Sequence, residues 1–271
     1  MKVAEESKPK EGKYIYCVMD FKEGEPEKDF GPLGMGERGD ELWSSSYKDV
    51  AAVISNSPIK KYPVCRENCL GHQRAVERVM EEGFTVLPVR YCTIADNEEQ
   101  VKKILKRDHE RFKDLLSKMK NKVEVGLKAL FEEKQIYQNI LSRNKEIRQR
   151  KERLINQPPE KTYQERAELG IMVEAALNRE KDKARTLALR SLEGLAEDYV
   201  VNDNYGERMF LNASFLVDKN KEQEFNEKVD ELNEKFGQEV KLKYVKGLPP
   251  FNFVCMEIDL DVKGVELDVG G

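Results

Sequence analysis

A strand that ends in two consecutive prolines is the sequence feature that most constrains how this chain can fold. Residues 240–245 alternate between two faces, with Val240, Leu242 and Tyr244 on one and Lys241, Lys243 and Val245 on the other, as a half-buried strand requires. The segment 247–250 (Gly-Leu-Pro-Pro) then interrupts the pattern, because each proline lacks a backbone donor and fixes φ. Residues 251–254 resume it at once. We therefore expect a closing strand that turns a rigid corner and re-enters the core, although a core strand with a simple proline bulge has the same pattern.

The composition excludes several classes of protein. The 271-residue chain is long enough for one large domain or two ordinary ones. Charged residues make up 36% of it at a net charge of only −4, so acidic and basic residues are mixed and no footprint for nucleic acid stands out. No apolar run approaches the ~20 residues of a membrane-spanning helix, and the first residues lack the apolar core of a signal peptide. We expect a cytoplasmic protein that binds neither nucleic acid nor a membrane.

The first part of the chain predicts a small α/β domain at 13–84. Its expected elements are strands at 13–19, 41–45 and 50–54, a loop at 23–40 and a helix at 66–82. Gly34, Gly36 and Gly39 match the dinucleotide-binding pattern G-x-G-x-x-G. They lead into a strand, whereas a dinucleotide site needs them to open a helix, so we expect no cofactor here.

The remaining elements predict a ferredoxin-like order, β-α-β followed by β-α-β. They are strand 85–93, helix 97–120, strand 122–131, helices between 132 and 198, strand 208–217, helix 221–236 and strand 240–246. The expected fold is thus α+β with two domains: the N-terminal α/β domain and a ferredoxin-like βαββαβ domain at 85–258. A helical hairpin insertion at about 132–198 interrupts the second domain, and flexible tails are expected at 1–12 and 259–271.

The predicted hairpin has narrow apolar stripes and a proline turn. Ile140, Ile147 and Leu154 recur every seven residues, and Pro158-Pro159 separates the two helices. Because these stripes are thin, we expect that a short linker could replace the hairpin and leave a folded remainder.

One cluster could suggest a metal site. Cys65, Cys69 and His72 share a helix face at i, i+4 and i+7, and thiolate and imidazole are the usual zinc ligands. A structural zinc needs four ligands, and the only other histidine, His109, falls in a different helix. The five cysteines are scattered, and we interpret them as small core residues rather than a disulfide framework. We expect no bound metal.

No catalytic constellation is apparent from the sequence. The chain has no phosphate-binding loop, no metalloprotease motif and no nucleophile elbow. A rival class remains open, namely an enzyme or small-ligand-binding protein that uses the ferredoxin-like sheet. A buried cleft lined by Arg90, Tyr91 and His109 would favour that class, whereas an exposed apolar surface would favour a role in assembly.

Six segments, in order along residues 13–256, resemble the gas vesicle protein F/L family. They are KYIYCVM at 13–19, YKDVAAVIS at 47–55, LPVRYCTI at 87–94, KVEVGLK at 122–128, FLNASFLV at 210–217 and KGLPPFNFV at 246–254. The family's usual last motif is closer to G-P-W-P-P-Y-S-F. Leu248 stands here at its aromatic position, and Phe251-Asn252 replaces Tyr-Ser. Tyr91-Cys92 replaces the usual Phe-Gly after P-V-R.

The resemblance implies a non-enzymatic accessory protein of the gas vesicle, located in the cytoplasm with that compartment. Such a protein helps to assemble the shell, or forms a minor part of it, by binding its major hydrophobic protein, gas vesicle protein A. Other gas vesicle accessory proteins are further expected partners. From the residues themselves we predict that the corner Leu248, Pro249, Pro250 and Phe251 offers a firm apolar surface to a partner, since prolines leave less ordering to be done on binding.

Overall fold

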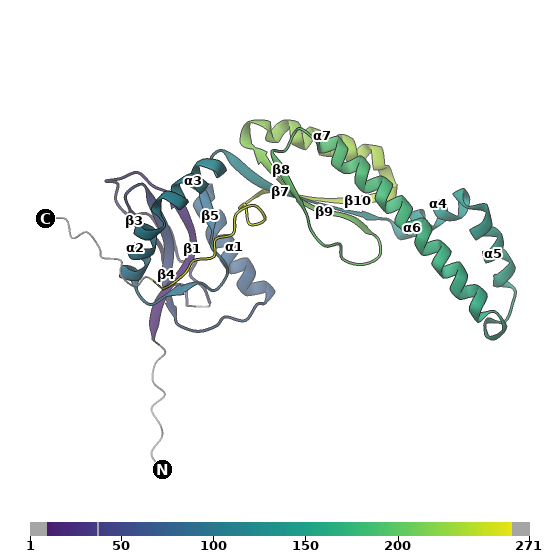
Figure 1. Ribbon diagram of the computed structural model, residues 1–271, viewed down its shortest axis with the longest axis horizontal. Coiled ribbons are helices and arrows are strands. Elements are labelled where there is room, and N and C mark those ends of the chain that lie inside the picture. The colour runs from purple at the N-terminus through teal and green to yellow at the C-terminus, as the bar shows by residue number, and fades with distance from the viewer. Residues whose placement is uncertain (1–9, 37, 262–271) are drawn as a thin grey trace, which may run out of the picture. The chain divides into compact units, whose positions relative to one another are not determined.

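The computed structural model describes residues 10–36 and 38–261, which form two compact units (Figure 1). Unit 1 combines the chain up to Glu124 with the chain from Gly247 onward, and unit 2 is Val125–Lys246. This division differs from the predicted domain boundary at 84/85. The elements between 85 and 124 pack on the first sheet, because their apolar faces complete its core.

Unit 1 is built on a sheet that has six strands in the described part of the chain. The strand order is β2-β3-β4-β1-β5, and β6 also pairs with β1. The strands are β1 (Glu11–Asp20), β2 (Asp29–Gly31), β3 (Leu42–Tyr47), β4 (Val50–Pro58), β5 (Val86–Pro88) and β6 (Ile94–Ala95). β1, β3 and β4 confirm the first three predicted strands, whereas the sequence did not predict the short β2.

The side chains of β1 divide between the two faces of this sheet. Tyr14, Tyr16 and Cys17 join one apolar core together with residues of α1 (Arg66–Glu81). Ile15 joins a second core with residues of α2 (Glu98–Arg107) and α3 (His109–Met119). The register against β4 shifts between Ile15 and Cys17, and this bulge explains why Tyr16 and its neighbour Cys17 belong to the same core.

The predicted strand 85–93 is divided in the structure. β5 ends at Pro88, Cys92 adopts φ 66°, and β6 begins only at Ile94. Both pieces pair with β1, for instance through Cys17 and Pro88. The prediction that this strand forms a β-α-β unit with strand 122–131 is therefore wrong. The predicted helix 97–120 is also divided, because α2 ends and α3 begins at Asp108.

Unit 2 has one sheet with the strand order β10-β7-β9-β8 in the part of the chain that the structure describes. Its elements are β7 (Lys122–Phe131), α4 (Glu133–Arg143), α5 (Lys145–Ile155), α6 (Tyr163–Leu192), β8 (Asp198–Val201), β9 (Met209–Asp218), α7 (Glu222–Phe236) and β10 (Val240–Leu248). Short 3₁₀ turns occur at 159–161, 219–221 and 237–239. The sequence did not predict β8.

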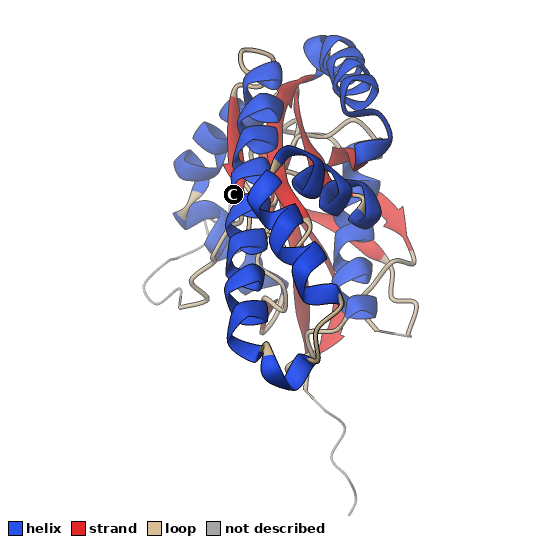
Figure 2. Ribbon diagram, turned by 90° about the vertical axis from the view of Figure 1, so that its right-hand side faces the viewer, coloured by secondary structure: helices blue, strands red, loops and turns tan. Residues whose placement is uncertain are grey.

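Helices α5 and α6 run side by side as the predicted hairpin (Figure 1, Figure 2). The C-terminal half of α6, however, contacts β9 and α7. Ala184, Ala188 and Leu192 are buried there, with Leu192 only 1% exposed. These helices therefore supply part of the core of unit 2. This differs from the expectation of a replaceable insertion, because a narrow apolar stripe is enough where small residues meet a sheet.

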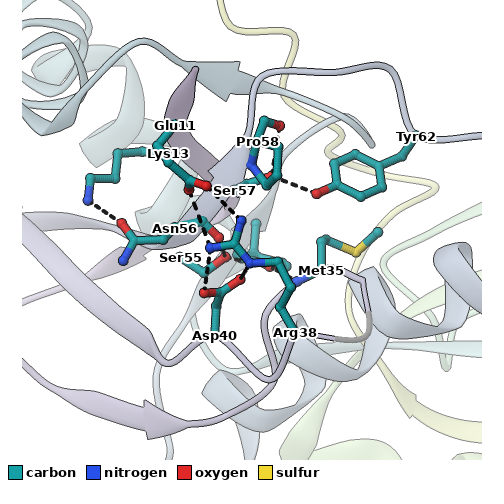
Figure 3. A network of polar contacts seen from close by, with 11 residues as sticks. Glu11, Lys13, Met35, Arg38, Asp40, Ser55, Asn56, Ser57, Pro58 and Tyr62 are labelled. Atoms are coloured by element: carbon teal, nitrogen blue, oxygen red, sulfur yellow. Dashed lines mark hydrogen bonds and ion pairs between the residues drawn. The ribbon is translucent and has the colours of Figure 1, made fainter. Parts of the chain in front are cut away.

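The glycine-rich loop between β2 and β3 is held by polar contacts (Figure 3). The Arg38 guanidinium donates to Glu11 Oε1 at 2.8 Å and to Asp40 Oδ1 at 3.1 Å. The buried Tyr16 hydroxyl accepts from the backbone N of Met35 at 2.7 Å. The loop leads into strand β3, as the sequence analysis expected.

Most of the two predicted tails, residues 1–9 and 262–271, lies outside the described residues. The described remainder has defined contacts. Glu11 begins β1, and the Arg107 guanidinium donates to the carbonyl oxygens of Asp259 and Asp261 at 2.8 and 3.0 Å. Residues 259–261, which the prediction assigned to the tail, therefore contact unit 1.

Candidate functional site

The double-proline corner follows the last residue of β10. Gly247 adopts φ 66°, which glycine tolerates, and Pro249 and Pro250 are both buried. The backbone N of Phe251 donates to Pro249 O at 2.7 Å, and that of Val254 donates to Pro250 O at 2.8 Å. The corner is thus a hydrogen-bonded turn rather than a bulge within a continuous strand.

Beyond the corner the chain returns to the sheet of unit 1. Met256 forms a parallel bridge with Val89, donates to Pro88 O at 2.8 Å and accepts from the backbone N of Arg90 at 2.9 Å. Met256 is 2% exposed and belongs to the core beneath α2 and α3, whereas Phe251 packs against the core on the α1 face. The corner therefore carries the chain from one face of the sheet to the other.

A pocket of about 370 Å³ lies against this corner, wholly within unit 1. Its lining residues come from the corner, from α1, from the loop after β5 and from the start of β7: Leu248, Pro249, Phe251, Asn252, Cys69, His72, Gln73, Tyr91 and Glu124. We call it the corner pocket. Three of the four predicted partner-binding residues line it, and the fourth, Pro250, is buried outside its lining.

Glu124 places a carboxylate in this largely apolar pocket. The residue is 2% exposed. Its Oε2 accepts from the backbone N of Asn252 at 2.9 Å, and its Oε1 accepts from Asn252 Nδ2 at 2.6 Å. These two bonds join the corner to Glu124 near the start of strand β7. Strand alternation assigns Val123 and Val125 to the core face and gives no sign that the residue between them is buried, so sequence reasoning missed Glu124.

His72 forms the floor of the pocket and is 3% exposed. Its Nε2 lies 3.1 Å from Val89 O, which can only accept, so Nε2 carries the proton. Its Nδ1 then accepts from the Tyr14 hydroxyl at 3.1 Å, while that hydroxyl accepts from the backbone N of Cys92 at 2.8 Å. Burial lowers the pKa of His72 to about 4, with the Val89 hydrogen bond opposing that effect, so the imidazole is neutral at pH 7.

The suspected metal ligands do not form a metal site in the described part of the chain. Cys65 and Cys69 are exposed, and both ring nitrogens of His72 already have hydrogen-bond partners. Within residues 10–36 and 38–261, no group of three or more His, Cys, Asp or Glu side chains is arranged to hold a metal ion.

Arg90, Tyr91 and His109 have different surroundings in the described part of the chain. Arg90 is an exposed partner of Glu257 at 2.8 Å, and His109 Nε2 contacts Asp49 Oδ1 at 2.5 Å. Only Tyr91 lines the corner pocket. The cleft that would have favoured an enzyme is therefore not formed by these three side chains.

Comparison with known proteins identifies the family. The family model described as "Gas vesicle synthesis protein GvpL/GvpF" matches residues 12–255, which include both sheets and the corner. The chain belongs to this family. It is 26% identical to gas vesicle protein F of Dolichospermum flosaquae over 207 residues, covering 76% of this chain and 84% of the relative. It is also 21% identical to gas vesicle protein F of Haloferax mediterranei over 250 residues, covering 92% and 95%.

Two solved structures of this family share the fold. The crystal structure of gas vesicle protein F from Anabaena sp. PCC7120 aligns with a TM-score of 0.75 at 23% identity and covers 91% of this chain and 99% of that one. That of Microcystis aeruginosa aligns with a TM-score of 0.68 at 24% identity and covers 89% and 98%. At these identities the likeness shows the mixed α/β fold. Among the described residues, no helix combines the length and apolarity that crossing a membrane requires.

Proposed function

We propose that this chain is a non-enzymatic accessory protein of the gas vesicle. In this role it acts in the cytoplasm and helps to assemble the vesicle shell, or forms a minor part of it, by binding the major hydrophobic shell protein, gas vesicle protein A. The observation that carries the proposal is the family match over residues 12–255, since the family's description names gas vesicle synthesis. Other gas vesicle accessory proteins are further proposed partners.

The corner is the surface that we assign to the shell protein. Leu248 and Phe251 are partly exposed while the prolines between them are buried, so two apolar side chains project from a fixed backbone. A rigid apolar surface loses little conformational entropy on binding. Its contacts with a hydrophobic partner are then favoured by burial of apolar area.

Co-purification tests the proposal. Tagged full-length protein is co-expressed with gas vesicle protein A and recovered under mild conditions, and an unrelated tagged protein of similar charge serves as the control. We expect the shell protein to co-elute with this chain and not with the control. Equal recovery with both would mean non-specific capture of an aggregation-prone protein, and no recovery would contradict the assigned partner.

We also propose that unit 2 is a ferredoxin-like sheet with different boundaries from those predicted. Its elements run β7, helices α4–α6, β8, β9, α7 and β10, which is a β-α-β-β-α-β order. On this interpretation α4–α6 form the first crossover and β8, missed by the sequence analysis, is the second strand. An experimental structure of residues 125–246 with a different strand order would contradict it.

A further inference from the structure

The corner pocket combines a buried carboxylate with aromatic and aliphatic walls. Leu248, Pro249, Tyr91 and Phe251 supply the walls, and Glu124 supplies the negative charge. Two other lining residues, Cys69 and Asn252, are exposed, so the pocket reaches the protein surface. A space of this size with one charged group has the composition of a binding site for a small ligand or a single side chain.

No lysine or arginine side chain lines the pocket beside Glu124 in the described part of the chain. None of the described ion pairs includes this carboxylate. Its two oxygens offer about four acceptor positions, of which Asn252 uses two. A buried carboxylate is costly when it lacks a counter-charge, and an incoming cation would offset that cost.

The other polar groups of the pocket do not compete for this role. His72 is neutral because burial lowers its pKa to about 4, so it brings no charge of its own. Gln73 Nε2 already donates to Glu77 Oε1 at 2.7 Å. The strongest interaction still open to a ligand is therefore with the carboxylate of Glu124.

The aromatic and aliphatic walls of the pocket favour arginine over lysine as the incoming cationic side chain. The rings of His72, Tyr91 and Phe251 all line the pocket, and the centroid of the His72 ring lies 5.9 Å from that of Tyr91 and 6.0 Å from that of Phe251. A planar guanidinium stacks on aromatic rings and forms paired hydrogen bonds with a carboxylate, whereas an ammonium is a compact and strongly hydrated charge. Leu248 and Pro249 offer an apolar surface to an aliphatic stem.

We propose that the corner pocket binds an arginine side chain of a partner polypeptide, with the guanidinium at Glu124 between Tyr91 and Phe251. This assignment concerns the class of side chain and does not depend on which protein carries it. It thus extends beyond the proposed function: the pocket can bind arginine even if gas vesicle protein A is not the partner.

Small probes test the assignment on the full-length protein. n-Butylguanidinium is titrated against n-butylurea, its uncharged isostere, and against n-butylammonium, while the backbone amide signal of Asn252 is followed by NMR. We expect n-butylguanidinium to shift this signal and to bind at least about tenfold more tightly than n-butylurea, the margin of a charge-assisted hydrogen bond. Equal binding of n-butylurea would contradict the need for charge, and equal binding of n-butylammonium would contradict the choice of arginine.

Variants then locate the site. Glu124→Gln removes the charge, and we expect it to reduce n-butylguanidinium binding to the level of n-butylurea; Glu257→Gln, which removes an exposed carboxylate outside the pocket, should leave binding unchanged. Glu124→Gln could fail to fold, because its amide group opposes the Asn252 donors. In that case Phe251→Leu serves as the test, since it keeps the carboxylate and removes one aromatic wall. We expect Phe251→Leu to weaken the binding of n-butylguanidinium several-fold more than the binding of n-butylurea. Undiminished n-butylguanidinium binding by folded Glu124→Gln, or by Phe251→Leu in its place, would overturn the proposal.

Discussion

The chain makes two turns with consecutive prolines, and they differ in nearly every physical respect. Pro249 and Pro250 are buried beside a carboxylate that is itself 2% exposed. Pro158 and Pro159, at the tip of the α5–α6 hairpin, are exposed. The same dipeptide therefore fixes a buried corner in unit 1 and merely reverses direction at the surface of unit 2.

The contacts around the two turns explain the difference. The hairpin tip depends on exposed ion pairs such as Arg153–Glu165 and on the Arg166 guanidinium, which donates to Leu154 O at 2.7 Å and to Gln157 O at 3.1 Å. Exposed ion pairs contribute little, and each can be lost alone. At the corner, backbone constraint, burial and the Glu124 hydrogen bonds act on the same few residues. Burial, and not the proline motif, thus indicates which turn other parts of the molecule depend on.

The largest expected effect is on the folding of unit 2, which we expect to depend on the body of the helical hairpin and not on its tip. Replacing residues 133–192 by a flexible linker removes the half of α6 that packs on β9, so we expect unit 2 to lose cooperative unfolding. Trimming only residues 149–169 spares that packing and should leave a folded unit 2. Far-UV circular dichroism follows the helices of both units, while Trp43, the sole tryptophan, reports on unit 1 alone. A second cooperative far-UV transition in the longer replacement, separate from the transition that Trp43 reports, would contradict this account.

The sequence identified most elements but could not pair the strands. Alternation predicted strand 122–131 with the bounds that β7 has, since Val123, Val125 and Leu127 share the buried face. The same reasoning failed for 85–93, because the break depends on Pro88 and on the positive φ of Cys92, whose hydrogen-bond partners come from distant segments.

The candidate site was also only partly predictable. The apolar residues of the corner follow from the local break in the strand pattern. Glu124 and its partner Asn252 are 128 positions apart, so only the fold brings the carboxylate to the corner. The helical spacing of His72 from Cys65 and Cys69 suggests a metal ligand, whereas the fold uses both of its ring nitrogens for internal hydrogen bonds.

A smaller effect, on the pH dependence of the free energy of unfolding, is expected from His72 in the corner pocket. Because burial lowers its pKa from 6.5 to about 4, the unfolded chain binds a proton more readily than the folded chain. Its contribution to stability is therefore fully present above about pH 6.5 and is lost as pH falls toward 4, on the order of 3 kcal/mol in total. We expect Trp43-monitored unfolding of His72→Gln to show a flatter pH dependence over this window. If the free energy of unfolding depended on pH in the same way for the unchanged protein and for His72→Gln, the low pKa of His72 would be contradicted.

The two double-proline turns are compared directly by alanine substitution. Pro249→Ala with Pro250→Ala frees the chain in its unfolded state and removes buried contacts, so we expect a loss of about 1–2 kcal/mol. The matched change at Pro158 and Pro159 frees the unfolded chain equally but removes no buried contacts, so its loss should be smaller by at least about 0.5 kcal/mol. Denaturant unfolding gives the free energy of unfolding of both double variants. Equal losses of this free energy would show that burial does not distinguish the two turns.

The smallest expected effect is at the exposed ion pairs of the hairpin. Arg153→Ala removes the pairing with Glu165 where both side chains are about half exposed, and we expect a change below about 1 kcal/mol that shrinks further in high salt. Arg166→Ala should cost more, because it leaves the carbonyls of Leu154 and Gln157 without that donor. A larger effect from Arg153 than from Arg166 would reverse this ranking.

The most direct test of the account compares shell-protein binding by apolar residues at the two turns. Leu248→Ser changes the corner, and Tyr163→Ser changes an 80%-exposed side chain at the hairpin tip. Recovery of gas vesicle protein A is measured for each variant alongside the Trp43 unfolding midpoint. The account predicts that Leu248→Ser loses most of the shell protein with a nearly unchanged midpoint, while Tyr163→Ser retains it. Normal recovery by a stable Leu248→Ser variant would contradict the corner as the binding surface.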